Sequence, residues 1–90
     1  MLKNLEELIL IIRERKKNPS DLSYTNKLLN DKSLSVEKVK EEILELIEAV
    51  EKNTNKIHEA ADVLYHLFVY LERNEVKIED VMQELEKRKK

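Results

Sequence analysis

Apolar residues recur at helical spacing along most of the chain, and this pattern predicts an all-helical protein. In the first segment one face collects Leu5, Leu8, Ile9 and Ile12. Such spacing indicates an amphipathic helix, which we expect to run from Leu2 to Lys17. A loop is expected at residues 18–21, followed by a short helix at residues 23–30 with Ser23 or Asp21 as its N-cap.

The second half of the chain predicts three more helices. Ser35 is the expected cap of a third helix, which ends near Asn53. The apolar face of that helix carries Val39, Ile43, Leu46, Ile47 and Val50. Asn53 or Thr54 is expected to cap a fourth helix that runs to about Arg73, where Asn74 ends it in left-handed geometry. The apolar stripe of the last helix consists of Ile78, Val81, Met82 and Leu85.

The fourth helix is apolar on nearly all of its circumference between Ala60 and Leu71, where the sequence reads AADVLYHLFVYL. A helix of this kind must be covered on every side. The chain has only 90 residues, and its other helices cannot easily wrap this one. A homodimer with the fourth helix at its centre is therefore expected, and a monomer covered by its short and last helices is the alternative. We expect one all-α domain over residues 1–90, a bundle of four to five helices completed by homodimerisation.

Composition narrows the possible functions. The chain has 17 basic and 19 acidic side chains, a formal charge of −2 that argues against nucleic acid as a partner. The basic runs at residues 13–17 and 87–90 are expected to be solvated helix ends. No cysteine and no glycine are present, which excludes disulfides, thiolate chemistry and glycine-rich phosphate loops. No apolar run approaches the ~18 residues of a membrane span, and the N-terminal segment predicts an amphipathic helix, not a signal peptide. We expect a cytoplasmic protein without a membrane partner.

Two pairs of acidic residues are expected to meet between the third and fourth helices. Glu42 and Glu45 are three positions apart, and so are Glu59 and Asp62 on the next helix. A short loop joins the two helices, so an antiparallel hairpin would gather four carboxylates. Clustered carboxylates repel one another, and a hard divalent cation such as Mg²⁺ relieves that repulsion while bridging to phosphate. Glu42 and Glu45 alone could be ordinary solvated charges, whereas an aspartate inside an apolar helix favours a site.

His66 lies one turn after Asp62 on the same helix face. It could ligate a metal, donate to a carboxylate, contact a phosphate, or be a satisfied core residue. Neither His58 nor His66 has a glutamate three positions before it, so the pattern of a diiron carboxylate bundle is not met.

Three motifs in order resemble the phosphoribosyl-ATP pyrophosphohydrolase family. They are SYT followed by KLL within residues 23–29, EEILE at residues 41–45 and EAADVLYHLFVYL at residues 59–71. This family is one of the MazG-like all-α nucleotide pyrophosphohydrolases, and the similarity extends over essentially the whole chain. It implies a dimeric bundle that uses Mg²⁺ to hydrolyse phosphoribosyl-ATP to phosphoribosyl-AMP and pyrophosphate, the second step of histidine biosynthesis.

The resemblance also implies roles for individual residues. The metal ligands would be Glu42, Glu45, Glu59 and Asp62. Glu41 would support the site or orient water, so the catalytic set would be Glu41, Glu42 and Glu45. Contacts to phosphate or ribose would come from Arg15, Ser23, Tyr24, Thr25, Lys27 and Lys38, with His66 as a further candidate. Two alternatives remain: a house-cleaning enzyme for nucleoside triphosphates, and a non-catalytic dimeric helical module whose acids are only surface charge.

Overall fold

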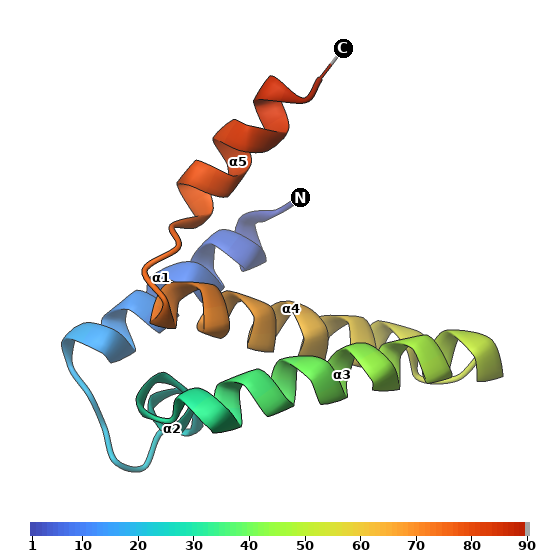
Figure 1. The fold of residues 1–90 in the computed structure, drawn as a ribbon, viewed down its shortest axis with the longest axis horizontal. Helices are drawn as coiled ribbons and strands as arrows, with labels where there is room; N and C mark the ends of the chain where they lie inside the picture. The colour runs from blue at the N-terminus through green and yellow to red at the C-terminus, as the bar shows by residue number, and fades with distance from the viewer. Residues whose placement is uncertain (90) are drawn as a thin grey trace.

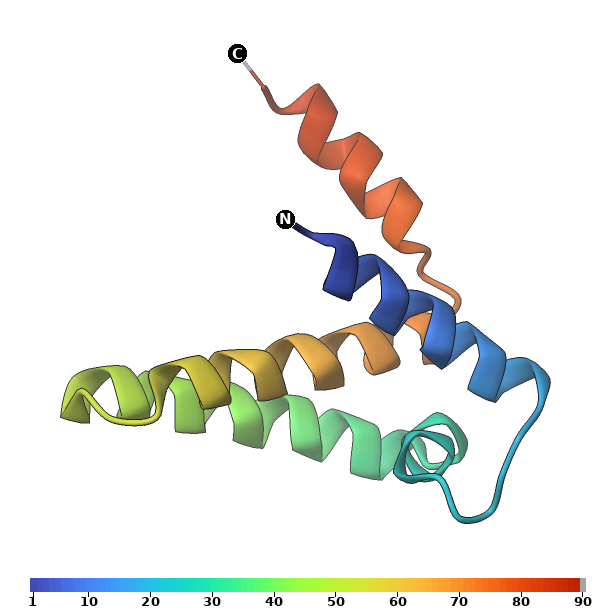
Figure 2. The same ribbon diagram turned by 180° about the vertical axis from the view of Figure 1, so that it is seen from behind.

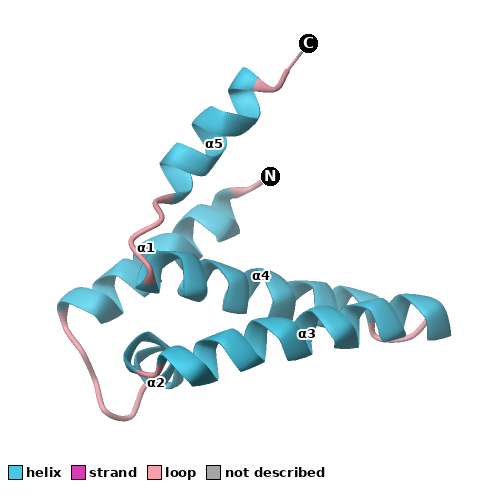
Figure 3. Cartoon of the chain, in the orientation of Figure 1, coloured by secondary structure: helices cyan, strands magenta, loops and turns pink. Residues whose placement is uncertain are grey.

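Two long antiparallel helices, α3 and α4, form the central hairpin of the fold (Figure 1). The computed structural model describes residues 1–89, and this part contains five helices and no β-strand (Figure 3). Their bounds are α1 Lys3–Lys17, α2 Tyr24–Asn30, α3 Lys32–Lys52, α4 Lys56–Arg73 and α5 Ile78–Lys87. The all-α class expected from the hydrophobic pattern is therefore confirmed. Within the described residues no helix is both long and apolar enough to cross a membrane.

The turn between α3 and α4 depends on asparagine. Asn53 and Asn55 have φ angles of 55° and 51°, in the left-handed region where asparagine is enriched among non-glycine residues. The N–H of Asn53 also bonds to the carbonyls of Ala49 and Val50, so the predicted end of α3 is confirmed. The predicted cap of α4 is wrong, because its N-cap is Asn55 and not Asn53 or Thr54. Side-chain capping needs an extended backbone at the N-cap, and the left-handed Asn55 makes no such bond.

The start of α3 also differs from the expectation. The carboxylate of Asp31 accepts a hydrogen bond from the N–H of Leu34 at 3.0 Å and caps the helix. The helix therefore begins at Lys32, one turn before the predicted cap Ser35, which is buried within it. Aspartate and serine are comparable capping residues, so the local sequence did not distinguish the two starts.

The end of α4 is correctly predicted at Arg73, but the geometry that follows is not. Asn74 has φ of −97°, and Glu75 takes the left-handed conformation with φ of 58°. The side-chain amide of Asn74 donates to the carbonyl of Tyr70 at 2.7 Å, and its backbone N–H donates to the carbonyls of Tyr70 and Leu71 at 3.2 and 3.1 Å. Asparagine thus ends this helix through both its side chain and its backbone.

The core lies at the open end of the hairpin, where α1 and α2 pack against α4 (Figure 2). Its buried residues are Ile12, Leu28, Phe68 and Val69. The buried Asn26 donates to the carbonyl of Arg15 at 2.8 Å and accepts from the N–H of Ser20 at 2.9 Å. These two bonds tie α2 to the end of α1 and the following loop, which fixes the position of Tyr24 at the start of α2.

Much of the apolar surface of the hairpin is exposed in the single chain. Large apolar side chains on α3 and α4 remain accessible, namely Ile43, Leu44, Ile47, Val50, Ile57 and Leu64. The buried residues of α4 lie in its second half. The sequence led us to expect that one chain cannot cover α4 on every side, and in the structure it does not.

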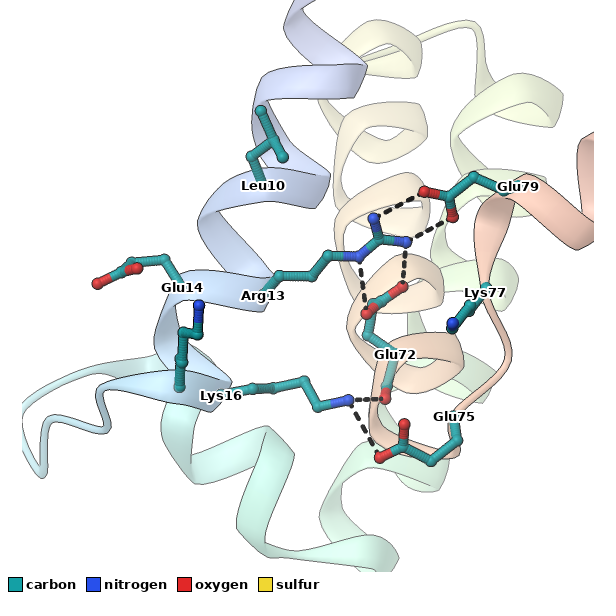
Figure 4. A pocket seen from close by; sticks show the side chains of 9 residues that line it. Leu10, Arg13, Glu14, Lys16, Glu72, Glu75, Lys77 and Glu79 are labelled. Atoms are coloured by element: carbon teal, nitrogen blue, oxygen red, sulfur yellow. Dashed lines mark hydrogen bonds and ion pairs between the residues drawn. The ribbon is translucent and has the colours of Figure 1, made fainter.

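An ion-pair cluster connects α1, α4 and α5 (Figure 4). The guanidinium of Arg13 donates to both carboxylate oxygens of Glu72, at 3.1 and 3.0 Å, and to both of Glu79, at 2.8 and 2.6 Å. Lys16 donates to the carbonyl of Glu72 at 2.7 Å and to the carboxylate of Glu75 at 3.2 Å. The expectation that residues 13–17 are solvated helix ends is wrong for Arg13 and Lys16, because both are paired with groups of the chain. Those groups lie more than fifty positions away in the sequence, so the local pattern did not reveal them.

Candidate active site

The acidic residues of α3 and α4 do meet across the hairpin. One carboxylate oxygen each from Glu42, Glu45 and Glu59 lie within 4.8 Å of one another. A second group, formed by His58, Glu59 and Asp62, has the same spacing. Glu59 belongs to both groups, so the acids form one continuous cluster along the facing sides of the two helices.

Glu42 is the most buried acid of this cluster, with 8% of the residue exposed. Within residues 1–89 its Oε2 is buried and has no hydrogen-bond partner, and the same is true of Oε2 of Glu59. Burial, followed by the negative charges of Glu45, Asp62 and Glu59, raises the pKa of Glu42 to about 7. Burial and the charges of Glu45 and Asp62 also raise the pKa of Glu59. The cluster is therefore short of positive charge.

These properties suit a hard metal ion. Carboxylate oxygens are the ligands that Mg²⁺ and Ca²⁺ prefer. A buried oxygen without a partner is unfavourable, and a cation between Glu42, Glu45 and Glu59 would satisfy the unpaired oxygens while removing the like-charge repulsion. The acidic cluster can thus hold a metal ion, and its donor atoms fit one.

Asp62 lies at the exposed end of the cluster and not in the apolar core. Its carboxylate is 3.3 Å from Nε2 of His58, one turn before it, and its side chain is 36% exposed. The apolar run around Asp62 in the sequence therefore does not surround its carboxylate in space. Sequence reasoning did not place His58 in the site, although the spacing of four positions on a helix brings it beside Asp62.

His66 is bound on both sides of its ring. Nδ1 donates to the backbone carbonyl of Asp62 at 2.9 Å, and Nε2 lies 3.2 Å from the hydroxyl of Tyr24. The residue is only 7% exposed and packs edge-on against Tyr24 and Tyr65. Both ring nitrogens of His66 are therefore engaged, one with a backbone carbonyl and the other with a hydroxyl.

Two of the residues that the resemblance implied as phosphate or ribose contacts, Tyr24 and Lys38, lie on the side of the acids that faces α2. Lys38 forms an ion pair with Glu41 at 3.2 Å, and this bond raises the pKa of Lys38. Burial raises the pKa of Tyr24, the charge of Lys38 opposes that shift, and Glu42 and Glu41 add to it. A cation and a hydroxyl therefore flank the negative cluster on its α2 side.

The remaining predicted contact residues have other surroundings. Ser23 caps α2 by accepting from the N–H of Asn26 at 3.3 Å, and Thr25 is buried in a hydrogen bond with the hydroxyl of Tyr65. Both side chains therefore shape α2. Arg15 and Lys27 are exposed, and within residues 1–89 no hydrogen bond or ion pair joins their side chains to the acids.

Comparison with known proteins places this arrangement in a family. Residues 5–89 match the family described as phosphoribosyl-ATP pyrophosphohydrolase. The phosphoribosyl-ATP pyrophosphatase of Clostridium novyi is 48% identical over 92 residues, covering 96% of this chain and 81% of the relative. The enzyme of that name from Haloarcula marismortui is 38% identical over 90 residues, covering 94% of this chain and 92% of the relative.

A larger relative contains a similar segment. The histidine biosynthesis bifunctional protein HisIE of Pyrococcus furiosus is 43% identical over 91 residues, covering 100% of this chain but 42% of that protein. No solved structure gives a significant match to this chain. With the family description matching nearly the whole chain and relatives of that name at this level of identity, the resemblance in the motifs is confirmed, and the chain belongs to the phosphoribosyl-ATP pyrophosphohydrolase family.

Proposed function

We propose that this chain, as one all-α domain over residues 1–90, hydrolyses the α–β phosphoanhydride of phosphoribosyl-ATP. The products are phosphoribosyl-AMP and pyrophosphate, and the reaction is the second step of histidine biosynthesis. Family membership supports the choice of substrate. The observation that carries the chemistry is the buried, unpartnered Oε2 of Glu42 beside Glu45 and Glu59, since such a cluster is costly to a fold and useful to a metal-dependent hydrolase.

Mg²⁺ is the cofactor that we propose for this cluster. The ligands would be Glu42, Glu45, Glu59 and Asp62, all of which offer hard oxygen atoms. When bound, Mg²⁺ supplies positive charge that offsets the charge of the polyphosphate and of the leaving pyrophosphate.

The other side chains position the substrate and the attacking water. In this proposal Glu41, held by Lys38 at 3.2 Å, accepts a hydrogen bond from the water that attacks the α-phosphorus in line. The water oxygen bonds to phosphorus and releases a proton as the bond to the bridging oxygen breaks, and pyrophosphate leaves with the electron pair of that bond. Lys38 contributes positive charge beside the phosphates, while Arg15 and Lys27 are exposed cations suited to the outer phosphates. Ser23 and Thr25 act by holding α2, and so Tyr24, in place.

We also propose that two chains pair through the exposed apolar surface of the hairpin. Apolar residues such as Ile47 and Val50 on α3 would otherwise stay in contact with water. The change Ile47→Glu should convert the dimer to a monomer in sedimentation experiments, because pairing would bury an unpartnered charge. A parent protein that sediments as a monomer at micromolar concentration would contradict the pairing.

The activity is tested by comparing substrates under matched conditions. We expect turnover of phosphoribosyl-ATP with Mg²⁺, loss of that turnover in EDTA, and much slower hydrolysis of ordinary or deoxynucleoside triphosphates. Pyrophosphate release from each substrate gives the ratio. A preference for deoxynucleotides would instead favour a house-cleaning pyrophosphohydrolase, and no turnover of any nucleotide would favour a non-catalytic helical module.

A further inference from the structure

The hydroxyl of Tyr24 lies next to the acidic cluster, and the fold fixes the direction of its hydrogen bond with His66. It lies 3.2 Å from Nε2 of His66, and Nδ1 of the same ring lies 2.9 Å from the carbonyl oxygen of Asp62. A carbonyl oxygen can only accept, so Nδ1 must carry a proton. In the neutral ring Nε2 then has none, and it can only accept.

This tautomer decides what Tyr24 can offer to a ligand. The single O–H of the tyrosine is used to donate to Nε2 of His66. The lone pairs of the phenol oxygen remain, and they can only accept. Phosphate oxygens also only accept, so a neutral Tyr24–His66 pair does not suit a phosphate. The pair suits a ligand group that carries a proton.

The ring of Tyr24 is held in place while part of it stays accessible. Tyr65 stacks on it with ring centroids 6.4 Å apart, and His66 meets its edge at 5.9 Å. The residue is nonetheless 44% exposed, so a ligand can reach it. The hydroxyl meets His66, whose Nδ1 binds the carbonyl of Asp62, so one residue links the phenol to the acidic cluster.

We propose that Tyr24 accepts a hydrogen bond from a ribose hydroxyl of the nucleotide, with His66 as the positioning residue that fixes this direction. The ribose is the part of a nucleotide next to the α-phosphate, and its hydroxyls carry protons. This inference rests on the proposed nucleotide pyrophosphohydrolase function and identifies which part of the substrate Tyr24 recognises. Tyr24 and His66 thereby select for sugar hydroxyls, and the acids and Lys38 deal with the phosphates.

The test is a double-mutant cycle in which Tyr24→Phe is combined with substrates that lack one ribose hydroxyl. We expect Tyr24→Phe to lower kcat/KM for phosphoribosyl-ATP by about ten-fold, a loss of the size expected for one hydrogen bond. The same comparison is made on phosphoribosyl adducts of 2′-deoxyATP and 3′-deoxyATP. On one of these two analogues, Tyr24→Phe should have the same kcat/KM as the parent protein. Effects of the substitution on the fold are shared by all substrates and cancel in this ratio. An equal loss on all three substrates would overturn the proposal.

Variants at His66 test the positioning role. His66→Gln keeps an acceptor near the position of Nε2 and should retain most of kcat/KM. His66→Asn places its amide near Nδ1 and loses that acceptor, so it should resemble Tyr24→Phe and add little when combined with it. Tyr70→Phe removes a hydroxyl from the same helix as His66 and serves as the matched control with unchanged turnover. Equal losses in the Gln and Asn variants would show that His66 only fills space.

Two measurements do not depend on catalysis. At pH 8.5, where an imidazole is neutral, ¹⁵N spectra of the histidine rings should show Nδ1–H and a bare Nε2 for His66, and the opposite tautomer would overturn the proposal. Calorimetry of the parent and of Tyr24→Phe with AMP, 2′-deoxyAMP and 3′-deoxyAMP gives the corresponding ratio of affinities. Failure of the parent to bind any of the three nucleotides would also count against the ribose contact. If phosphoribosyl-ATP is not hydrolysed but this binding ratio holds, the proposed function is wrong and the ribose contact stands.

Discussion

Glu42 and Glu72 are glutamates on packed helices with nearly the same exposure, 8% and 7%, but with opposite surroundings. Glu72 faces Arg13, which donates to both of its oxygens, and Lys16 binds its carbonyl (Figure 4). Glu42 faces other acids, and its Oε2 has no hydrogen-bond partner within residues 1–89. One buried carboxylate is satisfied by the chain itself, and the other keeps an unsatisfied oxygen and like-charged neighbours.

This difference distinguishes a structural cluster from a functional one better than pocket size does. A pocket of about 600 Å³ lies over the ion pairs of Arg13, and its lining includes Glu72 and Glu79. Its central charges already neutralise one another, so it offers no strong attraction for a charged ligand. The pocket at Glu45 and Glu59 is smaller, about 220 Å³, and Oε2 of Glu59 on its lining is buried without a hydrogen-bond partner within residues 1–89. Uncompensated charge, not volume, distinguishes the candidate site from the structural cluster.

The largest effect should come from removing the charge of Glu42. Glu42→Gln keeps the shape of the side chain, and we expect turnover of phosphoribosyl-ATP to fall by more than 100-fold, since even groups that only orient metal ligands are worth ~10- to 100-fold. The metal-free protein should melt no lower than the parent, because one of several repelling charges has gone. Turnover with Mg²⁺ and thermal melting in EDTA are the two measurements.

The control for Glu42→Gln is Glu48→Gln on the same helix. Glu48 pairs with Lys52 at the surface and should lose neither turnover nor measurable stability. Asp62→Asn should behave as Glu42→Gln does. A variant of Glu42 that melts far below the parent in EDTA yet keeps Mg²⁺-dependent turnover would reverse the comparison, and Glu42 would then be a residue of the fold.

Breaking the other cluster should reduce stability and leave chemistry intact. Arg13→Met keeps the aliphatic stem but leaves Glu72 as a buried charge without its partner. Removing one member of a fully buried pair costs ~3–5 kcal/mol, and about 1–3 kcal/mol is expected here because the side chain of Arg13 is 32% exposed. Urea unfolding measures the loss. Turnover per folded molecule should stay within about two-fold of the parent, since ion pairs at this end of the bundle are not part of the acidic site.

Glu79→Gln provides the comparison within that cluster. The carboxylate of Glu79 is 61% exposed, so its loss should matter far less than that of Arg13. If Arg13→Met leaves the unfolding free energy unchanged, Glu72 has found another partner, and the assignment of this cluster to the fold is wrong.

The helices were predictable because their pattern is local, whereas the ion pairs were not. Periodic apolar residues located four of the helices, and the expected cap at Ser23 or Asp21 located the short α2; the short turn at residues 53–55 implied that the acids of α3 and α4 would meet. Errors at the helix ends arose where two residues compete for one role, as Asp31 and Ser35 do for a cap. Arg13 and Glu72 are 59 positions apart, and only the packing of α1 on α4 brings them together.

The same distinction applies inside the candidate site. The bond from His66 to the carbonyl of Asp62 spans one helical turn, so helix geometry alone permits it. The bond from Tyr24 to His66 spans 42 positions and requires α2 to be held across the end of the hairpin. The sequence therefore indicated that Glu42, Glu45 and Glu59 would meet, whereas the place of His58 and the direction of the hydrogen bonds of Tyr24 and His66 required the fold.

The smallest and most specific effect is that the two clusters respond to pH in opposite directions. The pKa of Glu42 is raised to about 7, mainly by burial, so the folded protein binds more protons than the unfolded chain between about pH 4.5 and 7. Stability of the metal-free protein should therefore fall as pH rises through that window. The full shift overstates the effect because solvent screens the open side of the site, and about 1–2 kcal/mol is expected.

The pKa of Glu79 is lowered to about 2 by its hydrogen bonds to Arg13, so the stability it contributes is present above about pH 4.5 and is lost as pH falls toward 2. Urea unfolding in EDTA across pH 4 to 8 separates the two effects. Glu42→Gln should reduce the fall in unfolding free energy that the parent shows as pH rises from about 4.5 to 7. Glu79→Gln should leave that fall unchanged and should reduce the loss of unfolding free energy as pH drops below about 4.5. Saturating Mg²⁺ should remove the upper loss, because a bound cation stabilises the ionised carboxylates by mass action. If the metal-free parent gains stability from pH 5 to 7, Glu42 is already ionised at low pH and the acidic cluster is not short of positive charge.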